Sequence, residues 1–143
     1  MNCSRRIGVP HRWHGARLPT LVRDEPRVGV IADVDTPDGR LRVVTTHLSF
    51  LRGWNVRQLR FLLRGLGDRS APVVLMGDLN MGRSTAERTT RMRPLVTGRT
   101  FPSHRPTSQI DHLLTDGPLR AVGGPVALPV SDHCALVADV TLS

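Results

Sequence analysis

The sequence contains no lysine and no tyrosine, and its 143 residues include only two cysteines. Aromatic residues make up 3% of the chain, which supplies few side chains for stacking on nucleic-acid bases. No apolar run approaches the roughly 20 residues of a membrane-spanning helix, and the first residues lack the apolar stretch of a signal peptide. Cys3 and Cys134 are too few for a disulfide framework, so we interpret them as free thiols. These absences predict a cytoplasmic protein without a transmembrane segment. No obligate protein partner is inferred from the sequence.

The charge of the chain is strongly basic. All 20 basic residues are arginine, against ten aspartates and two glutamates, and the formal net charge is +8. Such a balance favours anionic partners, such as nucleic acid, phosphate esters or a lipid headgroup surface. However, the arginines are spread along the chain without a block of five or six, and a bias of this kind is typical of GC-rich coding sequence. A basic module that binds nucleic acid or another polyanion is therefore an alternative rather than the leading interpretation.

Local patterns predict one domain over residues 1–143, in which residues 1–26 are irregular. Apolar and polar side chains alternate over residues 28–34 and again over residues 41–47, as in half-buried strands. The turn signal Pro37-Asp38-Gly39 lies between the two runs. The sequence therefore predicts an antiparallel hairpin at the start of residues 27–143, the region in which regular patterns can be recognised.

One helix and further strands are predicted after the hairpin. Apolar residues recur at spacings of three and four over residues 54–66, which predicts a helix with Asn55 as its cap. Residues 82–99 are predicted to be a loop with one short helix, and Gly123-Gly124-Pro125 to break the chain. Short apolar runs predict three strands: residues 71–76, 110–115 and 135–142.

Polar side chains gather where the predicted strands begin or end. A sheet can hold polar groups rigidly beside a cleft at such positions. Taken alone, each group is at least as consistent with an ordinary turn, loop or structural histidine as with a functional site. Four groups occur: His47, Asp78-Leu79-Asn80, Asp111-His112 and Ser131-Asp132-His133.

Together these residue types could hydrolyse a phosphate ester. Carboxylates such as Asp78 and Asp132, with water and a substrate phosphate, suit Mg²⁺. His47 and His133 could transfer a proton or bond a phosphoryl oxygen. A further aspartate, Asp111, could fix the tautomer of a nearby histidine and stabilise its imidazolium. Zinc is a poorer match because no cysteine or histidine pair has ligand spacing.

The order of four motifs resembles the endonuclease/exonuclease/phosphatase superfamily, which includes pancreatic deoxyribonuclease. The resemblance runs from about Glu25 to the C-terminus and implies a DNase I-like four-layer α/β/β/α sandwich with mostly antiparallel sheets. It also implies a phosphodiesterase or nuclease-like hydrolase that uses Mg²⁺, with Mn²⁺ as the other candidate ion, and a phosphate-ester substrate such as nucleic acid. The motifs are Thr46-His47-Leu48, residues 76–80 (Met-Gly-Asp-Leu-Asn), residues 109–114 (Gln-Ile-Asp-His-Leu-Leu) and residues 131–136 (Ser-Asp-His-Cys-Ala-Leu).

The resemblance also implies a role for individual residues. Asp78 matches the aspartate that orients or deprotonates the attacking water, and it shares the metal site with Asp132. Asp111 matches the aspartate that pairs with the final histidine, His133, beside the phosphate. The phosphate-binding positions are expected to be His47, Asn80 and Arg27.

The chain departs from the family pattern at its N-terminal side. Family members carry an asparagine on a first strand and a Gln-Glu pair after the next, and this glutamate is the principal Mg²⁺ ligand. Neither pattern occurs here, and Glu25 and Glu87 are the only glutamates. We therefore expect the C-terminal part of a family domain, incomplete at its N-terminus. A weakly active or inactive remnant of the fold is a second alternative.

Overall fold

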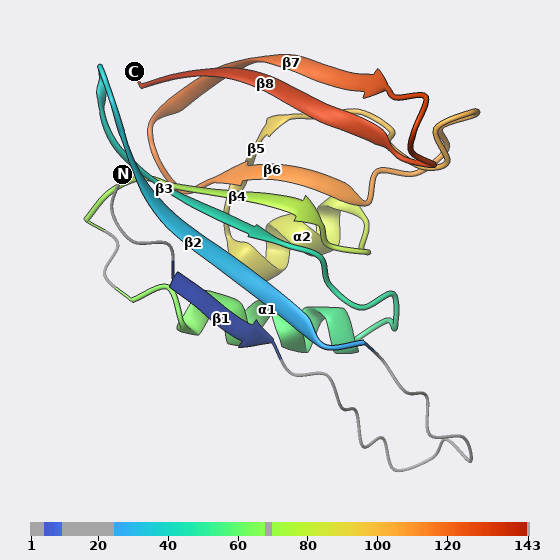
Figure 1. Ribbon diagram of the computed structural model, residues 1–143, viewed down its shortest axis with the longest axis horizontal. Coiled ribbons are helices and arrows are strands. Elements are labelled where there is room, and N and C mark those ends of the chain that lie inside the picture. Colours follow the sequence, from blue (N-terminus) through green and yellow to red (C-terminus); the bar gives the residue numbers. More distant parts are fainter. Residues whose placement is uncertain (1–4, 10–24, 68–69, 143) are drawn as a thin grey trace.

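The computed structural model of the protein describes residues 5–9, 25–67 and 70–142. The predictions for residues 10–24 and for Cys3 lie outside these residues. The elements follow one another along the chain (Figure 1) as β1 (Arg5–Val9), β2 (Arg27–Thr36), β3 (Gly39–Thr46), α1 (Trp54–Arg64), β4 (Val73–Asp78), α2 (Arg83–Thr90), β5 (Arg93–Val96), β6 (Asp111–Thr115), β7 (Leu119–Ala127) and β8 (Cys134–Leu142).

A six-stranded sheet in the order β1-β2-β3-β4-β6-β5 forms the centre of the molecule. The predicted hairpin is confirmed: β2 and β3 pair antiparallel, from Gly29 opposite Thr46 to Thr36 opposite Gly39. The next pair, β3 and β4, is parallel, whereas β4 and β6 are antiparallel. This combination of parallel and antiparallel pairing places the end of β3, the end of β4 and the start of β6 at the same edge of the sheet.

The sheet is covered differently on its two faces. Helices α1 and α2 lie on one face, and the antiparallel pair β7-β8 lies over the other as a second sheet (Figure 1). The fold is therefore a mixed α/β sandwich with mostly antiparallel sheets, as expected. The described elements form three layers, α/β/β, of the four that the resemblance implies.

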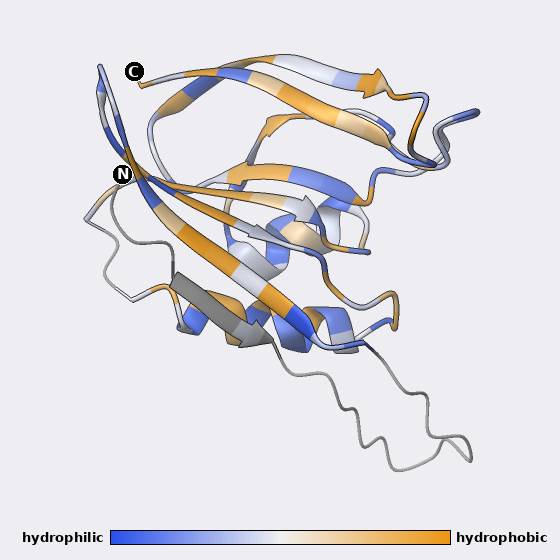
Figure 2. Ribbon diagram, in the orientation of Figure 1, coloured by the Kyte–Doolittle hydropathy of each residue, from blue (hydrophilic) through white to orange (hydrophobic). Residues whose placement is uncertain are grey.

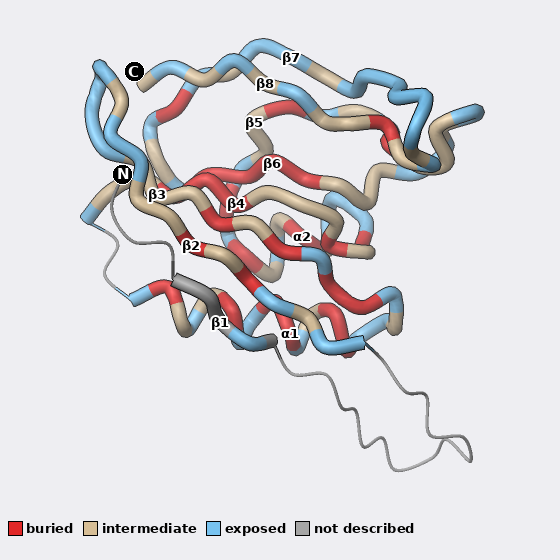
Figure 3. The backbone as a smooth tube through the Cα atoms, in the orientation of Figure 1, coloured by how far each residue is buried: buried red, intermediate tan, exposed pale blue. Residues whose placement is uncertain are grey.

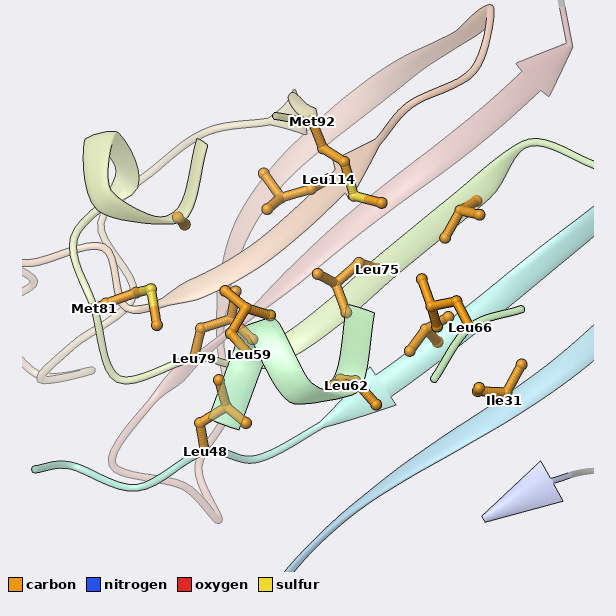
Figure 4. Packing of buried hydrophobic residues seen from close by; sticks show 13 residues of the cluster. Ile31, Leu48, Leu59, Leu62, Leu66, Leu75, Leu79, Met81, Met92 and Leu114 are labelled. Carbon is orange, nitrogen blue, oxygen red and sulfur yellow. The ribbon is translucent and has the colours of Figure 1, made fainter. Parts of the chain in front are cut away.

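Alternation along the central strands separates two apolar cores. Val73 and Leu75 of β4 pack under α1 with Leu59 and Leu62 (Figure 4), while Val74 faces the second sheet. Burial is concentrated in β4, β6 and the inner face of α1, whereas the strands β7 and β8 are largely exposed or half-buried (Figure 3). Apolar residues recur along β4 and β6 in keeping with this burial (Figure 2). Residues of even number in β4 therefore point into the space between the sheets.

Several local predictions need correction. Two strands, β1 and β5, lie in segments predicted to be irregular or loop. Gly123-Gly124-Pro125 does not break the chain but lies inside β7. There a Cβ on Gly123 would come within 2.0 Å of the Val137 carbonyl oxygen, so glycine permits the close pairing with β8. Asn55 is not the helix cap: Gly53 is, without a side-chain cap bond.

Candidate active site

Two aspartates face each other across the paired strands β4 and β6. Asp78 ends β4 and Asp111 begins β6, and the register places them directly opposite. Asp78 follows Val74 by four residues and Asp111 precedes Leu113 by two, so both carboxylates point into the space between the sheets, as these core residues do. The alternation of the two strands thus brings two acidic groups together at one end of the sandwich.

His133 completes a pair with Asp111 from the opposite sheet. Its Nδ1 lies 2.9 Å from Asp111 Oδ2, and its ring centroid lies 4.8 Å from that of Phe101. The loop before β8 is fixed because the Cys134 amide donates to the Thr100 carbonyl and the His133 amide donates to Ser131 Oγ. The predicted Asp-His pair is therefore brought within hydrogen-bond distance by two segments 22 residues apart.

His47 lies on the other side of Asp78. Its Nε2 is 3.4 Å from Asp78 Oδ2, and its side chain is 60% exposed. By contrast, the side chains of Asp111 and His133 are 18% and 24% exposed. His47 therefore borders the site from the solvent side.

Asn80 links the segment that follows β3, which carries His47, to the end of β4, which carries Asp78, through hydrogen bonds. The Asn80 amide donates to Asp78 Oδ1, and the Asn80 side-chain nitrogen donates to the Leu48 carbonyl. In return, the Leu48 amide donates to the Asp78 carbonyl. Asn55 of α1 donates a further bond, 2.7 Å long, to the Asn80 carbonyl. Asn80 thus holds the geometry of the site through three hydrogen bonds of its own, and the bond between Leu48 and Asp78 adds a fourth.

A glycine allows β3 and β4 to approach this closely. Gly77 has a φ of 130°, and a Cβ there would lie 2.0 Å from the Thr46 carbonyl oxygen. No other residue type fits this position without moving the backbone of β3. The glycine before Asp78 is therefore required by the packing beside the site.

Burial and neighbouring charge change the acidity of two site residues. Burial raises the pKa of Asp78, and the nearby Asp111 carboxylate raises it further, against the lowering effect of the Asn80 amide. Burial alone would lower the pKa of His133, but the hydrogen bond and charge of Asp111, with the charges of Asp78 and Asp132, raise it above its ordinary value. The carboxylates thus favour a protonated His133 in the absence of a bound cation.

Two predicted site residues stand apart from this cluster. Asp132 is exposed, and its backbone carbonyl accepts a hydrogen bond from the Ser103 amide. Arg27 lies at the same edge of the sheet, but on the face that α1 covers, where Gly29 two residues later packs against Leu62. The guanidinium of Arg27 is 4.0 Å from the carboxylate of Glu25. The role expected of Arg27 in phosphate binding stays a prediction.

His112 supports the site from the helix side of the sheet. It is buried, its Nε2 lies 2.8 Å from the Met81 carbonyl, and burial lowers its pKa. Sequence reasoning did not find this role, nor that of Asn55, because both depend on contacts between distant segments. His112 and Asn55 fix the backbone of residues 80–81 from two directions.

The donor set suits a divalent cation. Asp78, Asp111 and His133 each offer one ligand atom, and these atoms lie within 4.8 Å of one another. In the described part of the chain, the ion pairs of the two carboxylates are with histidines, not with arginine. Two carboxylates at this separation repel each other, and a hard cation would relieve the repulsion. The residues therefore fit Mg²⁺ or Mn²⁺ by their chemistry.

Comparisons with known proteins agree with this architecture. The profile of the Endonuclease/Exonuclease/phosphatase family matches residues 3–133. No curated protein matches the chain. Among the described residues, no helix has the length and apolar character to cross a membrane.

Solved structures share the fold at low sequence identity. An endonuclease/exonuclease/phosphatase from Beutenbergia cavernae is 23% identical with a TM-score of 0.68, and the match covers 100% of this chain and 45% of that one. A mannosyl-6-phosphatase from Bacteroides thetaiotaomicron is 16% identical with a TM-score of 0.61, covering 81% and 57%. D. rerio TDP2, complexed with a single-strand DNA product, is 15% identical with a TM-score of 0.63, covering 96% and 67%. This chain thus spans about half to two thirds of these proteins.

Proposed function

We propose that this chain, which belongs to the endonuclease/exonuclease/phosphatase family, hydrolyses a phosphate ester at the end of the sandwich where Asp78, Asp111 and His133 meet. The observation that carries the proposal is the convergence of their ligand atoms within 4.8 Å. Similar folds include a mannosyl-6-phosphatase and a protein that holds a DNA product, which supports phosphate esters as the substrate class.

His133 would act on the phosphoryl group as a hydrogen-bond or proton donor. Its Nδ1 is engaged by Asp111, which leaves Nε2 for a phosphoryl or leaving-group oxygen. The carboxylate orients the ring and stabilises the charged imidazolium. The raised pKa of His133 keeps it protonated closer to neutral pH, as this role requires.

Asp78 would orient and deprotonate the attacking water. Burial raises its pKa, which makes the ionised carboxylate a stronger base than an exposed aspartate. The amide of Asn80 fixes one carboxylate oxygen, and His47 lies beside the other. The exposed His47 would meet a second phosphoryl oxygen.

A divalent cation would be held by Asp78 with Asp111 or Asp132. When bound, it would supply charge stabilisation for the phosphoryl oxygens as a Lewis acid. Asp132 lies outside the three-residue cluster, but its charge contributes to the raised pKa of His133, which supports a place for it near the cation.

The test is hydrolysis of bis(p-nitrophenyl) phosphate by the purified chain during a Mg²⁺ titration. We expect weak turnover that a chelator abolishes and that Asp78→Asn lowers by at least about 10²-fold, the effect of losing one electrostatic group from an active site. Asp139→Asn is the matched control, because Asp139 is an exposed aspartate of β8.

Three results bear on the proposal. Loss of turnover in Asp78→Asn but not in Asp139→Asn supports it. Equal turnover in both variants would show that hydrolysis does not use this cluster. Binding of polyanions that weakens steeply with salt, without any turnover, would favour the basic binding module instead.

A further inference from the structure

A cavity of about 300 Å³ lies between the two sheets, with Asp111 and His133 in its wall. The rest of its lining is largely apolar. Met76 and Leu113 come from the central sheet, Leu136 comes from β8 of the second sheet, and Leu128 follows directly after the end of β7. The cavity therefore shares Asp111 and His133 with the site, and most of its other lining side chains are apolar.

The chemistry of the wall restricts what could enter. Among the residues that the structure describes, no arginine lines the cavity, so a second phosphate would find no guanidinium there. Two hydroxyl side chains, Thr45 and Ser131, interrupt the apolar lining. A few polar groups in an otherwise apolar pocket are typical of sites that orient a small uncharged ligand.

We infer that this cavity binds the uncharged ring of an aryl group that is esterified to the phosphate. The inference rests on the proposed function, because the phosphate would lie beside the Asp111–His133 pair in the cavity wall. A cavity of about 150 Å³ accepts benzene in another protein, so the volume here is sufficient for a larger ring. The hydroxyl groups of Thr45 and Ser131 favour a ring with a hydrogen-bonding substituent over a saturated alkyl chain, which could not hydrogen-bond with them.

The methionines of the chain provide a direct readout of ring binding. Met76 lines the cavity, whereas Met81 and Met92 are buried in the core on the helix side of the sheet. In protein labelled with ¹³C at its methionine methyl and histidine ring carbons, a bound ring should move the Met76 signal and leave the other two in place. Phosphate binding should move the His133 ring signal.

The probes are phenylphosphonate and methylphosphonate, whose phosphorus–carbon bonds resist hydrolysis, and phenol as a ring without phosphate. We expect phenylphosphonate to move both Met76 and His133, and to bind at least about tenfold more tightly than methylphosphonate, as a filled apolar pocket commonly allows. Methylphosphonate should move His133 alone. Phenol should move Met76 alone.

Leu128→Trp should fill the cavity with an indole ring. The variant should bind both phosphonates with equal affinity, while unchanged Met81 and Met92 signals show that it is folded. Val130→Trp is the matched control, since Val130 is 90% exposed and does not line the cavity. It should keep the preference for phenylphosphonate.

The outcomes separate this inference from the proposed function. If phenylphosphonate moves His133 but neither ring probe moves Met76, the cavity does not bind rings and the inference is overturned, while the phosphate site stands. If phenol moves Met76 but neither phosphonate moves His133, the cavity binds rings and the phosphate site is refuted. A preference for phenylphosphonate that survives Leu128→Trp would also overturn the inference.

Discussion

Replacement of Asn80 by alanine tests how the site is held together. The Asn80 side chain donates to the carbonyl of the fully buried Leu48, and its backbone has a φ of 50°, in the left-handed region. Alanine removes the donor and tolerates that φ poorly. Glycine removes the donor equally but adopts the same φ without strain. Comparison of Asn80→Ala with Asn80→Gly therefore separates the hydrogen bond from the backbone conformation.

The expected loss of stability follows from these two contributions. A buried carbonyl left without its partner costs about 1–3 kcal/mol. The left-handed conformation costs alanine about 1 kcal/mol more than it costs asparagine or glycine. We therefore expect Asn80→Ala to lower the free energy of unfolding by about 2–4 kcal/mol, a large part of the about 5–15 kcal/mol typical of a domain. Asn80→Gly should lower it by about 1 kcal/mol less.

Urea unfolding followed by tryptophan fluorescence measures both variants, since Trp54 is buried at the start of α1. With a slope of about 1–3 kcal/mol per molar urea, the Asn80→Ala midpoint should fall by about 1 M or more. Equal losses in the two variants would show that backbone strain contributes nothing. Losses within about 0.5 kcal/mol of zero, as for ordinary surface changes, would refute the reasoning altogether.

Three further predictions concern the same end of the sandwich. In an NMR titration, the pKa of His133 should lie above its ordinary value and fall in Asp111→Asn; an unchanged pKa would remove the pairing. Folding raises that pKa, so the Asp111–His133 pair should stabilise the protein fully below the ordinary histidine pKa of about 6.5. This stabilisation should be lost as pH rises through the pKa of His133 in the folded protein. The free energies of unfolding of wild type and Asp111→Asn should therefore differ less at high pH. Gly77→Ala should prevent stable folding, whereas Gly82→Ala, where a Cβ meets nothing within 4 Å, should fold normally in circular dichroism. Asp132→Ala should raise the Mg²⁺ concentration needed for half-maximal turnover; an unchanged Mg²⁺ dependence would assign the ion to Asp78 and Asp111 alone.

Hydrophobic periodicity predicted the elements whose apolar residues recur because one face is buried. The hairpin of β2 and β3, helix α1, and strands β4, β6 and β8 were all expected within a few residues of their bounds. Each has one face buried against a core, so its apolar residues recur with the period of its structure. The same alternation accounts for the side on which the acidic residues of β4 and β6 lie.

The edge strands β5 and β7 were not predicted from the sequence. Strand β5 contains Pro94, and β7 contains Pro125, and each pairs with a neighbour on one side only. Proline is tolerated there because its missing N–H can face away from the partner strand. Such residues look like chain breaks in a sequence, whereas in the sheet they also limit unwanted pairing at the edge.

Residues Asp111 and His112 are adjacent in sequence, yet they lie on opposite faces of one strand. Asp111 points between the sheets toward His133, while His112 is buried on the helix side against the Met81 carbonyl. An aspartate in a strand cannot pair with its sequence neighbour across the sheet, so its histidine had to come from another element. The parallel pairing of β3 with β4, and the antiparallel pairing of β4 with β6, bring His47, Asp78 and Asp111 to one edge. The loop before β8 then supplies His133, so the site depends on the strand order and not on any single motif.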